Sequence, residues 1–389
     1  MRTIAHMDLD TFFVSVERLR NSALVGKPII VGGLSDRGVV AACSYETRQF
    51  GVSSGMAIKI AKRLCPNAIF IKGDHDQYSH YSSMVTEIIA EKAPVFEKAS
   101  IDEHYLDLSG MDRFFGTHKW LHELRTRIIK ETGLPISCGL SVNKTVSKIA
   151  TGEAKPNGEK NVEAALVKPF LDPLSIKKIP GIGDKSYQTL RDMGIVYIAT
   201  LSAMPKNLMH QVMGENGIHI WEKANGIDER PVQAYFEQKS IGAEQTFETD
   251  TTDMKLLQST LTRMVQETSF EMRSQNKLCG CVTIKIRYSD FQTQTQQLRI
   301  QYTGYDHRIL EVALQLFQKL YNRRLLVRLI GVRLSHFVYG SQQIDLFTDS
   351  VSMINLYQAM DKIRNWYGKE AVYQAGAILP DGRKGRSRR

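Results

Sequence analysis

The chain has 389 residues, of which 42% are hydrophobic and 24% charged, and a formal net charge of +10 at pH 7. This length allows two to four domains, and the charge favours a polyanionic partner, with nucleic acid first and an anionic membrane surface second. No apolar run approaches the roughly twenty residues of a bilayer span, and the first residues lack a signal-peptide pattern. The five cysteines form no CxxC pair, so we expect reduced, cytosolic thiols.

The first predicted strand covers residues 4–10 and places Asp8 among apolar neighbours. A helical pattern follows over 11–18 and begins with Phe12 and Phe13. Core packing is the ordinary interpretation of both rings. Their position directly after a carboxylate-bearing strand also allows one ring to stand over a bound substrate.

Two short β-branched strands are predicted within residues 28–43, followed by helices over 56–64 and 76–93. Between them, Tyr45 and Arg48 are three residues apart, so on a helix they share a face and could together hold a phosphate tail. A surface ion pair is the ordinary alternative for Arg48.

A second carboxylate-bearing strand is predicted over residues 100–108, where Asp102 and Glu103 interrupt an apolar pattern. Most Asp-Glu pairs are solvated, but a buried pair needs a cation. Placed beside Asp8, the pair would form an oxygen cage suited to a hard divalent ion such as Mg²⁺.

A helix over 118–132, a strand over 136–141 and a helix ending in a turn at Lys155 come next. Residues 179–185, Ile-Pro-Gly-Ile-Gly-Asp-Lys, predict the hairpin of a helix-hairpin-helix. Gly181 and Gly183 would turn backbone N–H groups outward as a phosphate site beside Lys185, which favours sequence-independent DNA binding. A glycine-capped loop is the alternative.

A basic linker is predicted at about 230–245, followed by a separate α/β unit. Its strand over 281–288 alternates between apolar and basic residues, so one face would cover helices and the other could lie along a duplex backbone. Solvated side chains on a half-buried sheet are the alternative. The candidate DNA contacts on this sheet are Lys285, Arg287, Arg299 and Arg333.

With these segments in order, the chain resembles the Y-family translesion DNA polymerases of the DNA polymerase IV type. The resemblance covers nearly the whole length, from residues 6–13 to residues 343–347, and its most specific segments are residues 45–51, 100–103, 155–158 and 179–183. It implies a mixed α/β, right-hand architecture. The implied divisions are a palm (1–10 and 75–165), fingers (11–74), a helical thumb (166–232), a linker (233–241), an α/β little finger (242–340) and a tail (341–389).

The resemblance also implies residue roles. The metal ligands for two Mg²⁺ ions would be Asp8, the Leu9 carbonyl, Asp102 and Glu103, and the catalytic carboxylates would be Asp8, Asp102 and Glu103. The nucleotide would be held by Phe12, Phe13, Tyr45, Arg48 and Lys155, with Phe13 as the steric gate beneath the sugar. A sliding clamp would bind the tail through Gln343, Ile344, Leu346 and Phe347.

The implied activity is template-directed, error-prone transfer of dNTPs to a primer 3′-hydroxyl. The resemblance also implies a monomer that lies in a bacterial-type cytosol and associates with the nucleoid. We expect no proofreading exonuclease. His104 and Tyr105 depart from the commoner pattern after Glu103, and about forty residues continue past the clamp peptide. The alternatives are a catalytically idle DNA-binding relative, a mutasome-type Y-family polymerase, and a palm-type nucleotidyl cyclase, in which the hairpin and the C-terminal unit would have no purpose.

Overall fold

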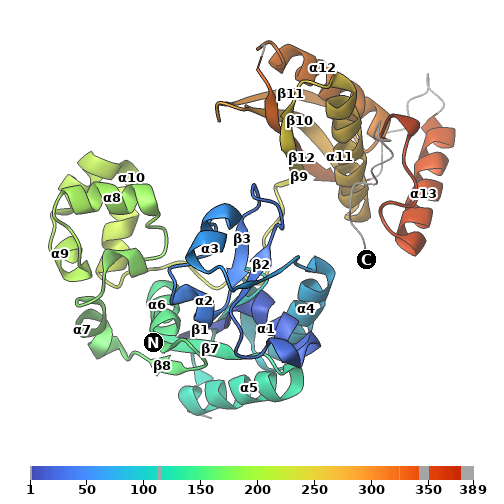
Figure 1. Cartoon of the computed structure of the whole chain (residues 1–389). Coiled ribbons are helices and arrows are strands. Elements are labelled where there is room, and N and C mark those ends of the chain that lie inside the picture. Colours follow the sequence, from blue (N-terminus) through green and yellow to red (C-terminus); the bar gives the residue numbers. More distant parts are fainter. Residues whose placement is uncertain (1, 112–115, 324, 341–349, 378–389) are drawn as a thin grey trace. The chain divides into compact units, whose positions relative to one another are not determined.

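The computed structural model describes residues 2–111, 116–323, 325–340 and 350–377 and divides the chain into two compact units, Met1–Phe236 and Glu237–Arg389 (Figure 1). The division falls inside the predicted linker. The prediction placed the end of the linker too late, because β9 (Ser240–Thr251) already begins at Ser240 and Ile241 joins the core of the second unit. In the described part of the chain, no helix has the length and apolar character needed to cross a membrane.

The first unit is built on a five-stranded sheet with the order β5-β6-β1-β7-β8. The strands are β1 (Ile4–Leu9), β5 (Val95–Lys98), β6 (Glu103–Asp107), β7 (Ile136–Ser141) and β8 (Glu159–Asn161). β1 is central and pairs antiparallel with both β6 and β7. Since side chains alternate along a strand, Met7 and Leu9 face the main core, whereas His6 and Asp8 face the other side of the sheet.

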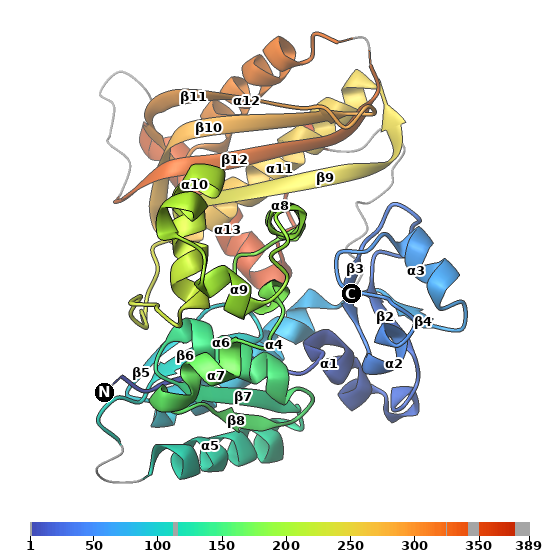
Figure 2. The same ribbon diagram turned by 90° about the vertical axis from the view of Figure 1, so that its left-hand side faces the viewer.

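Helices cover both faces of this sheet (Figure 2). On one face, apolar side chains of three helices complete the main core. These helices are α1 (Phe12–Arg20), α4 (His75–Lys92) and α5 (Thr117–Thr132). On the other face, α6 (Lys144–Ala154) packs against β7 and β1. The predicted helices at 76–93 and 118–132 therefore exist, with ends that differ by a residue.

The position of α6 depends on its start and on one glycine. Asn143 caps the helix, because its Oδ1 accepts a hydrogen bond of 3.0 Å from the Val146 N–H. Gly139 on β7 allows the close approach of the helix, since a Cβ at that position would lie 2.3 Å from the Ser147 carbonyl oxygen. The polar side chains of α6 are thereby held directly over the sheet.

A smaller, three-stranded sheet with the order β3-β2-β4 stands beside the first within the same unit. Its elements are β2 (Ile29–Gly32), β3 (Val40–Cys43) and β4 (Ile69–Ile71), with α2 (Tyr45–Arg48) and α3 (Ile58–Leu64). Ile30, Val40 and Ile58 contribute to a separate core. The first unit therefore contains a second, locally packed layer that carries Tyr45 and Arg48.

The remainder of the first unit is helical and follows β8 in the chain. Its helices are α7 (Val167–Leu171), α8 (Asp184–Asp192), α9 (Ile198–Ser202) and α10 (Lys206–Ala224). The predicted hairpin precedes α8, and Gly181 adopts a φ of +101°, which favours glycine. Lys223 on α10 supports the hairpin, because its Nζ donates a hydrogen bond of 2.7 Å to the Pro180 carbonyl.

The second unit contains a four-stranded antiparallel sheet with the order β11-β10-β12-β9. Its further elements are β10 (Lys277–Tyr288), β11 (Thr293–Thr303), β12 (Val327–Tyr339), α11 (Met254–Ser274) and α12 (Asp306–Leu320). Ile284 and Ile286 are fully buried against the helices, whereas Lys285 and Arg287 remain half-exposed. The predicted alternation along β10 is therefore confirmed.

The C-terminal segment packs on the helices of the second unit through α13 (Ser350–Tyr367). Arg273 of α11 pairs with Asp361 at 2.7 Å and also contacts Asp306, which is buried at the start of α12. Arg364 is 2% exposed and lies 3.8 Å from Asp306. This buried charge network makes α13 an integral part of the unit.

Candidate active site

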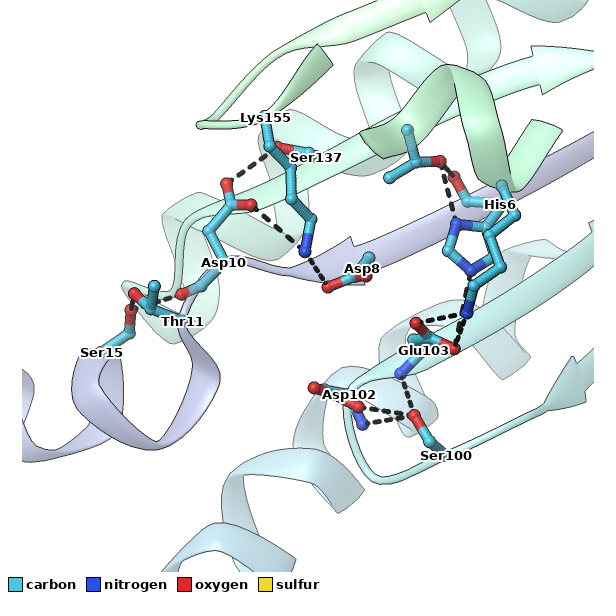
Figure 3. Close-up of polar contacts among 12 residues, drawn as sticks. His6, Asp8, Asp10, Thr11, Ser15, Ser100, Asp102, Glu103, Ser137 and Lys155 are labelled. Atoms are coloured by element: carbon cyan, nitrogen blue, oxygen red, sulfur yellow. Dashed lines mark hydrogen bonds and ion pairs between the residues drawn. The ribbon is translucent and has the colours of Figure 1, made fainter. Parts of the chain in front are cut away.

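The predicted carboxylates meet where β1 ends and β6 begins (Figure 3). Asp8 lies directly opposite Glu103 in the antiparallel register. Asp102 precedes β6, and its carbonyl oxygen accepts a hydrogen bond of 3.0 Å from the Leu9 N–H. The structure thus brings the four predicted metal-binding positions together although more than ninety residues separate the two strands.

Ser100 shapes the turn that presents these carboxylates. Its Oγ lies 2.5 Å from Asp102 Oδ1 and accepts a hydrogen bond of 3.0 Å from the Glu103 N–H. A serine side chain that bonds backbone groups two or three residues ahead stabilises a tight turn. The turn aims Asp102 and Glu103 to the same edge as Asp8.

Two lysines pair with these carboxylates. Lys155 Nζ lies 2.5 Å from Asp8 Oδ1, as Figure 3 shows. Lys148 Nζ contacts both oxygens of Glu103, at 2.6 and 2.5 Å. Sequence reasoning found Lys155 and missed Lys148. The position of Lys148 on the same face of α6 as Lys144 and Thr151 was the available signal.

Burial and charge act in opposite directions on the two facing carboxylates. Burial raises the pKa of Asp8 to about 7, although the Lys155 ammonium opposes this shift. Burial would also raise the pKa of Glu103, but contacts with His6 and Lys148 outweigh it and hold that pKa well below its usual range. Asp8 is therefore a carboxylate whose charge is incompletely compensated by the protein.

The chemistry of these donor atoms suits a hard divalent cation, but the described residues include no group of three His, Cys, Asp or Glu side chains already arranged to hold one. The available oxygens belong to Asp8, Asp102, Glu103 and the Leu9 backbone, and carboxylate and carbonyl oxygens are the ligands that Mg²⁺ prefers. A dication at this edge would stabilise the charged form of Asp8, which burial disfavours.

Asp10 is a buried residue of this site that sequence reasoning missed. Its Oδ2 accepts hydrogen bonds from Ser137 Oγ at 2.8 Å and from the Asn157 N–H at 2.6 Å, and its Oδ1 lies 3.8 Å from Lys155 Nζ. Asp10 therefore ties the turn that carries Lys155 to the end of β1. Its spacing of two residues from Asp8 on a strand was the signal for a shared face.

Tyr45 and Arg48 lie together on α2, with the Arg48 guanidinium 5.0 Å from the centre of the Tyr45 ring. Burial, followed by the negative charges of Asp10 and Asp8, raises the pKa of Tyr45 to about 12. The Tyr45 hydroxyl therefore remains protonated and can donate a hydrogen bond, while the exposed Arg48 side chain extends toward solvent.

The two aromatic residues after β1 have different environments. Phe12 is 3% exposed and belongs to the main core. Phe13 is only partly buried, and its ring stacks on Tyr78 at 4.2 Å with an interplanar angle of 11°. Tyr78 is anchored in turn, because its hydroxyl donates a hydrogen bond of 2.7 Å to Glu17. Of the two rings, Phe13 is the one that a substrate can reach.

The candidate DNA contacts belong to elements other than those that carry the carboxylates. In the first unit, Gly181, Gly183 and Lys185 are exposed at the start of α8. In the second unit, Lys285 and Arg333 line a cavity of about 430 Å³ on the open face of the sheet, where Lys285 Nζ lies 2.5 Å from Glu244.

Two further predicted contacts on this sheet have polar partners. Arg287 donates to Thr293 at 2.8 Å, and Arg299 lies 3.4 Å from His336. The predicted clamp-binding residues lie outside the described residues. They are Gln343, Ile344, Leu346 and Phe347.

His104 lies on the opposite face of β6 from Glu103. Its Nε2 is 3.0 Å from Thr86 Oγ1 on α4, and burial lowers its pKa to about 3. A neutral, buried imidazole packed on α4 adds no charge to the carboxylate edge. The departure from the commoner pattern at His104 therefore leaves the charge of the site unchanged.

Two parts of the chain match models of one protein family, and the whole chain is similar to known proteins. Residues 7–152 match the impB/mucB/samB family, and residues 238–346 match the C-terminal domain of the same family. The chain is 39% identical over 376 residues to DNA polymerase IV of Dehalococcoides mccartyi strain CBDB1, with 96% of each chain covered. It is 37% identical over 339 residues to DNA polymerase IV of Methanoculleus marisnigri, covering 86% of this chain and 94% of the relative.

Solved structures give the same picture. A Y-family polymerase chimera, Dbh-Dpo4(243-245)-Dbh, aligns with a TM-score of 0.79 at 27% identity, over 87% of this chain and 100% of the chimera. An insertion ternary complex of Dbh DNA polymerase aligns with a TM-score of 0.63 at 26% identity, with the same coverage.

Proposed function

The chain belongs to the Y-family of translesion DNA polymerases, in its DNA polymerase IV branch, and we propose that it carries out nucleotidyl transfer at the β1–β6 edge. The observation that carries this proposal is the register that sets Asp8 opposite Glu103, with Asp102 beside them. The reacting groups would be a primer 3′-hydroxyl and the α-phosphate of a dNTP paired with the template.

We assign Asp8, Asp102, Glu103 and the Leu9 carbonyl as the groups that would hold two Mg²⁺ ions, and Glu103 as the catalytic acidic residue next to the primer end. DNA polymerase IV relatives generally use divalent metal ions. When bound, such ions lower the pKa of the attacking hydroxyl and neutralise the departing pyrophosphate. The chain's own part is to hold carboxylates in place before substrate arrives.

The remaining roles follow from position and charge. Lys155 and Arg48 would offset the charge of the β- and γ-phosphates, and the Tyr45 hydroxyl would donate a hydrogen bond to the same tail. Phe13 would stand beneath the deoxyribose, where a ribose 2′-hydroxyl would clash with its ring. The stacking of Phe13 on Tyr78 supports this role because it restrains the ring.

We further propose the division into palm (1–10 and 75–165), fingers (11–74), thumb (166–232) and little finger (from β9 to residue 340). Primer-template DNA is the substrate of a polymerase, and the Dbh relative was solved as an insertion ternary complex. The exposed hairpin before α8 and the open face of the β9–β12 sheet would contact DNA phosphates. A sliding clamp would bind residues 343–347, and the enzyme would act as a cytoplasmic monomer.

Primer extension by the purified protein tests the proposal. The protein, a radiolabelled or fluorescent primer-template, four dNTPs and Mg²⁺ should give stepwise extension that chelation with EDTA abolishes. An idle DNA-binding relative would bind the same duplex and add no nucleotide. Synthesis of a cyclic nucleotide from a nucleoside triphosphate, without any primer, would instead identify a cyclase.

A further inference from the structure

A row of polar side chains on α6 and the turn that follows it meets partners on three strands of the main sheet. The members are separated by four, three and four residues, so they share one face of the helix and of the turn that follows it. They are Lys144, Lys148, Thr151 and Lys155, and their partners are Glu97 on β5, Glu103 on β6, and His6 and Asp8 on β1. The proposed nucleotide site accounts for Lys155 and leaves Lys148 without a role.

Lys148 is the charged partner of Glu103 in this row. Its Nζ lies 2.6 and 2.5 Å from the two carboxylate oxygens. The His6 Nε2 is 3.9 Å from Glu103, beyond hydrogen-bond distance, whereas the Lys148 ammonium contacts both carboxylate oxygens directly. Among the described residues, the negative charge of Glu103 is therefore neutralised mainly by the Lys148 ammonium.

The oxygens that Lys148 occupies are the ones that a metal ion at this edge would need. An ammonium group and a divalent cation compete for the same lone pairs, and they repel each other when both are close. The Lys148 side chain is 33% exposed, so its long aliphatic part allows the ammonium to swing toward water. A bound cation would therefore repel the Lys148 ammonium, and the partly exposed side chain can move away from Glu103 into water.

We propose that Lys148 is a positioning residue. In the metal-free enzyme its ammonium neutralises the negative charge of Glu103 and orients the carboxylate. When a divalent cation binds, Lys148 releases Glu103, and this exchange sets the cation affinity of the site. This inference rests on the proposed role of Glu103 as a metal ligand. It assigns Lys148 no contact with the nucleotide, in contrast to Lys155.

The test uses Mn²⁺ as a paramagnetic probe for the free protein, with unbound Mn²⁺ measured by electron paramagnetic resonance. Lys148→Met removes the charge at nearly constant length, and Lys148→Arg retains it. Lys206→Met is the matched control, because Lys206 pairs with Glu222 at 2.9 Å outside the site. Thermal unfolding is recorded for each variant in EDTA and in saturating Mn²⁺, without DNA.

We expect Lys148→Met to bind Mn²⁺ about tenfold more tightly than the wild type, since the ammonium that competes with the cation for the Glu103 oxygens is removed. Its unfolding temperature in EDTA should fall and should recover with Mn²⁺ more than that of the wild type. Lys148→Arg should lie within about twofold of the wild-type affinity, as should Lys206→Met. Should Lys148→Met not fold, Lys148→Gln serves the same comparison.

Unchanged or weaker Mn²⁺ binding by the charge-removing variant would overturn the inference. A second control places the effect at Glu103: in a Glu103→Gln background, Lys148→Met should leave Mn²⁺ affinity unchanged, and an equal gain there would refute the pairing. Failure of the proposed function has a different signature, because a wild-type protein that extends no primer would disprove polymerase activity whatever its Mn²⁺ affinity.

Discussion

The carboxylate edge of the first unit and the open sheet face of the second both place charged side chains on antiparallel strand pairs, but the charges differ in burial and pairing. At the carboxylate edge, the charges are partly buried, and Asp8 and Glu103 each have a lysine partner within 2.6 Å. On the open face, Arg333 is exposed, and Lys285 is only half-buried beside Glu244.

This difference corresponds to two functions, stabilisation of a reacting centre and contact with a phosphate backbone. Groups that stabilise a reacting centre must be fixed before the substrate arrives and must act where water screens them little. Groups that contact a phosphate backbone gain by releasing counterions and can remain mobile and solvated. Removing a charge from the first region should therefore abolish chemistry, whereas removing one from the second should weaken binding by a graded amount.

The largest expected effect is the loss of chemistry without loss of binding. Glu103→Ala should lower the rate of single-nucleotide insertion by roughly 10³-fold or more, because a group at the reacting centre is removed. Its affinity for primer-template DNA should stay within about twofold of wild type. Rapid-quench kinetics and fluorescence anisotropy measure the two quantities, and insertion near the wild-type rate would disprove the assignment.

The next effect concerns the sugar of the incoming nucleotide. Phe13→Ala should improve the use of ribonucleotides relative to deoxynucleotides by roughly 10- to 200-fold, because a steric contact with the 2′-hydroxyl disappears. Competition between rNTP and dNTP at one template position provides the measurement. Phe12→Ala is the matched control.

Phe12→Ala removes a buried ring and should mainly cost stability, about 3–5 kcal/mol, with little change in sugar selectivity. Chemical denaturation measures that loss. If Phe12→Ala rather than Phe13→Ala relaxed the selectivity, the gate would have to be reassigned.

A smaller, graded effect is expected on the open face of the second unit. Arg333→Gln should weaken duplex binding a few-fold and reduce the slope of log affinity against log salt by about 1, whatever the DNA sequence. Lys319→Gln, an exposed change on the helical side of the same unit, is the control. An unchanged slope for Arg333→Gln, or a loss confined to one DNA sequence, would contradict phosphate contact.

The smallest effect on bare DNA is expected for the tail. Leu346→Ala combined with Phe347→Ala should leave insertion on an open primer-template unchanged and remove the stimulation that a loaded sliding clamp provides, because tethering acts through effective concentration. The assay compares extension with and without the clamp. Equal stimulation of variant and wild type would show that another segment binds the clamp.

Much of the fold was predictable, because it depends on short-range periodicity. The alternation along β10 and the helices at 76–93 and 118–132 follow from patterns within a few residues of each other. The end of the linker was placed wrongly, because charge and turn residues near Ser240 concealed the inward-facing Ile241 of an edge strand.

The missing parts of the site are long-range. Lys148 lies 45 positions from Glu103, and Asp10 lies 127 positions from Ser137, so no local pattern connects these partners. Spacing marks Lys148 and Asp10 as candidates, but their partners could be identified only once α6 and β7 were placed on β1. The sequence showed which residues carry charge but not which oppositely charged residues pair with each other.

The sequence by itself determined the family, the chemistry-bearing residue types and the faces of the strands, because motif spacing and side-chain alternation are local properties of the chain. Only the tertiary structure decided that Phe13 rather than Phe12 is accessible, that His104 faces α4, and that Lys148 compensates Glu103. The physical reason is that burial and ion pairing depend on neighbours brought together by packing, which the local sequence does not specify.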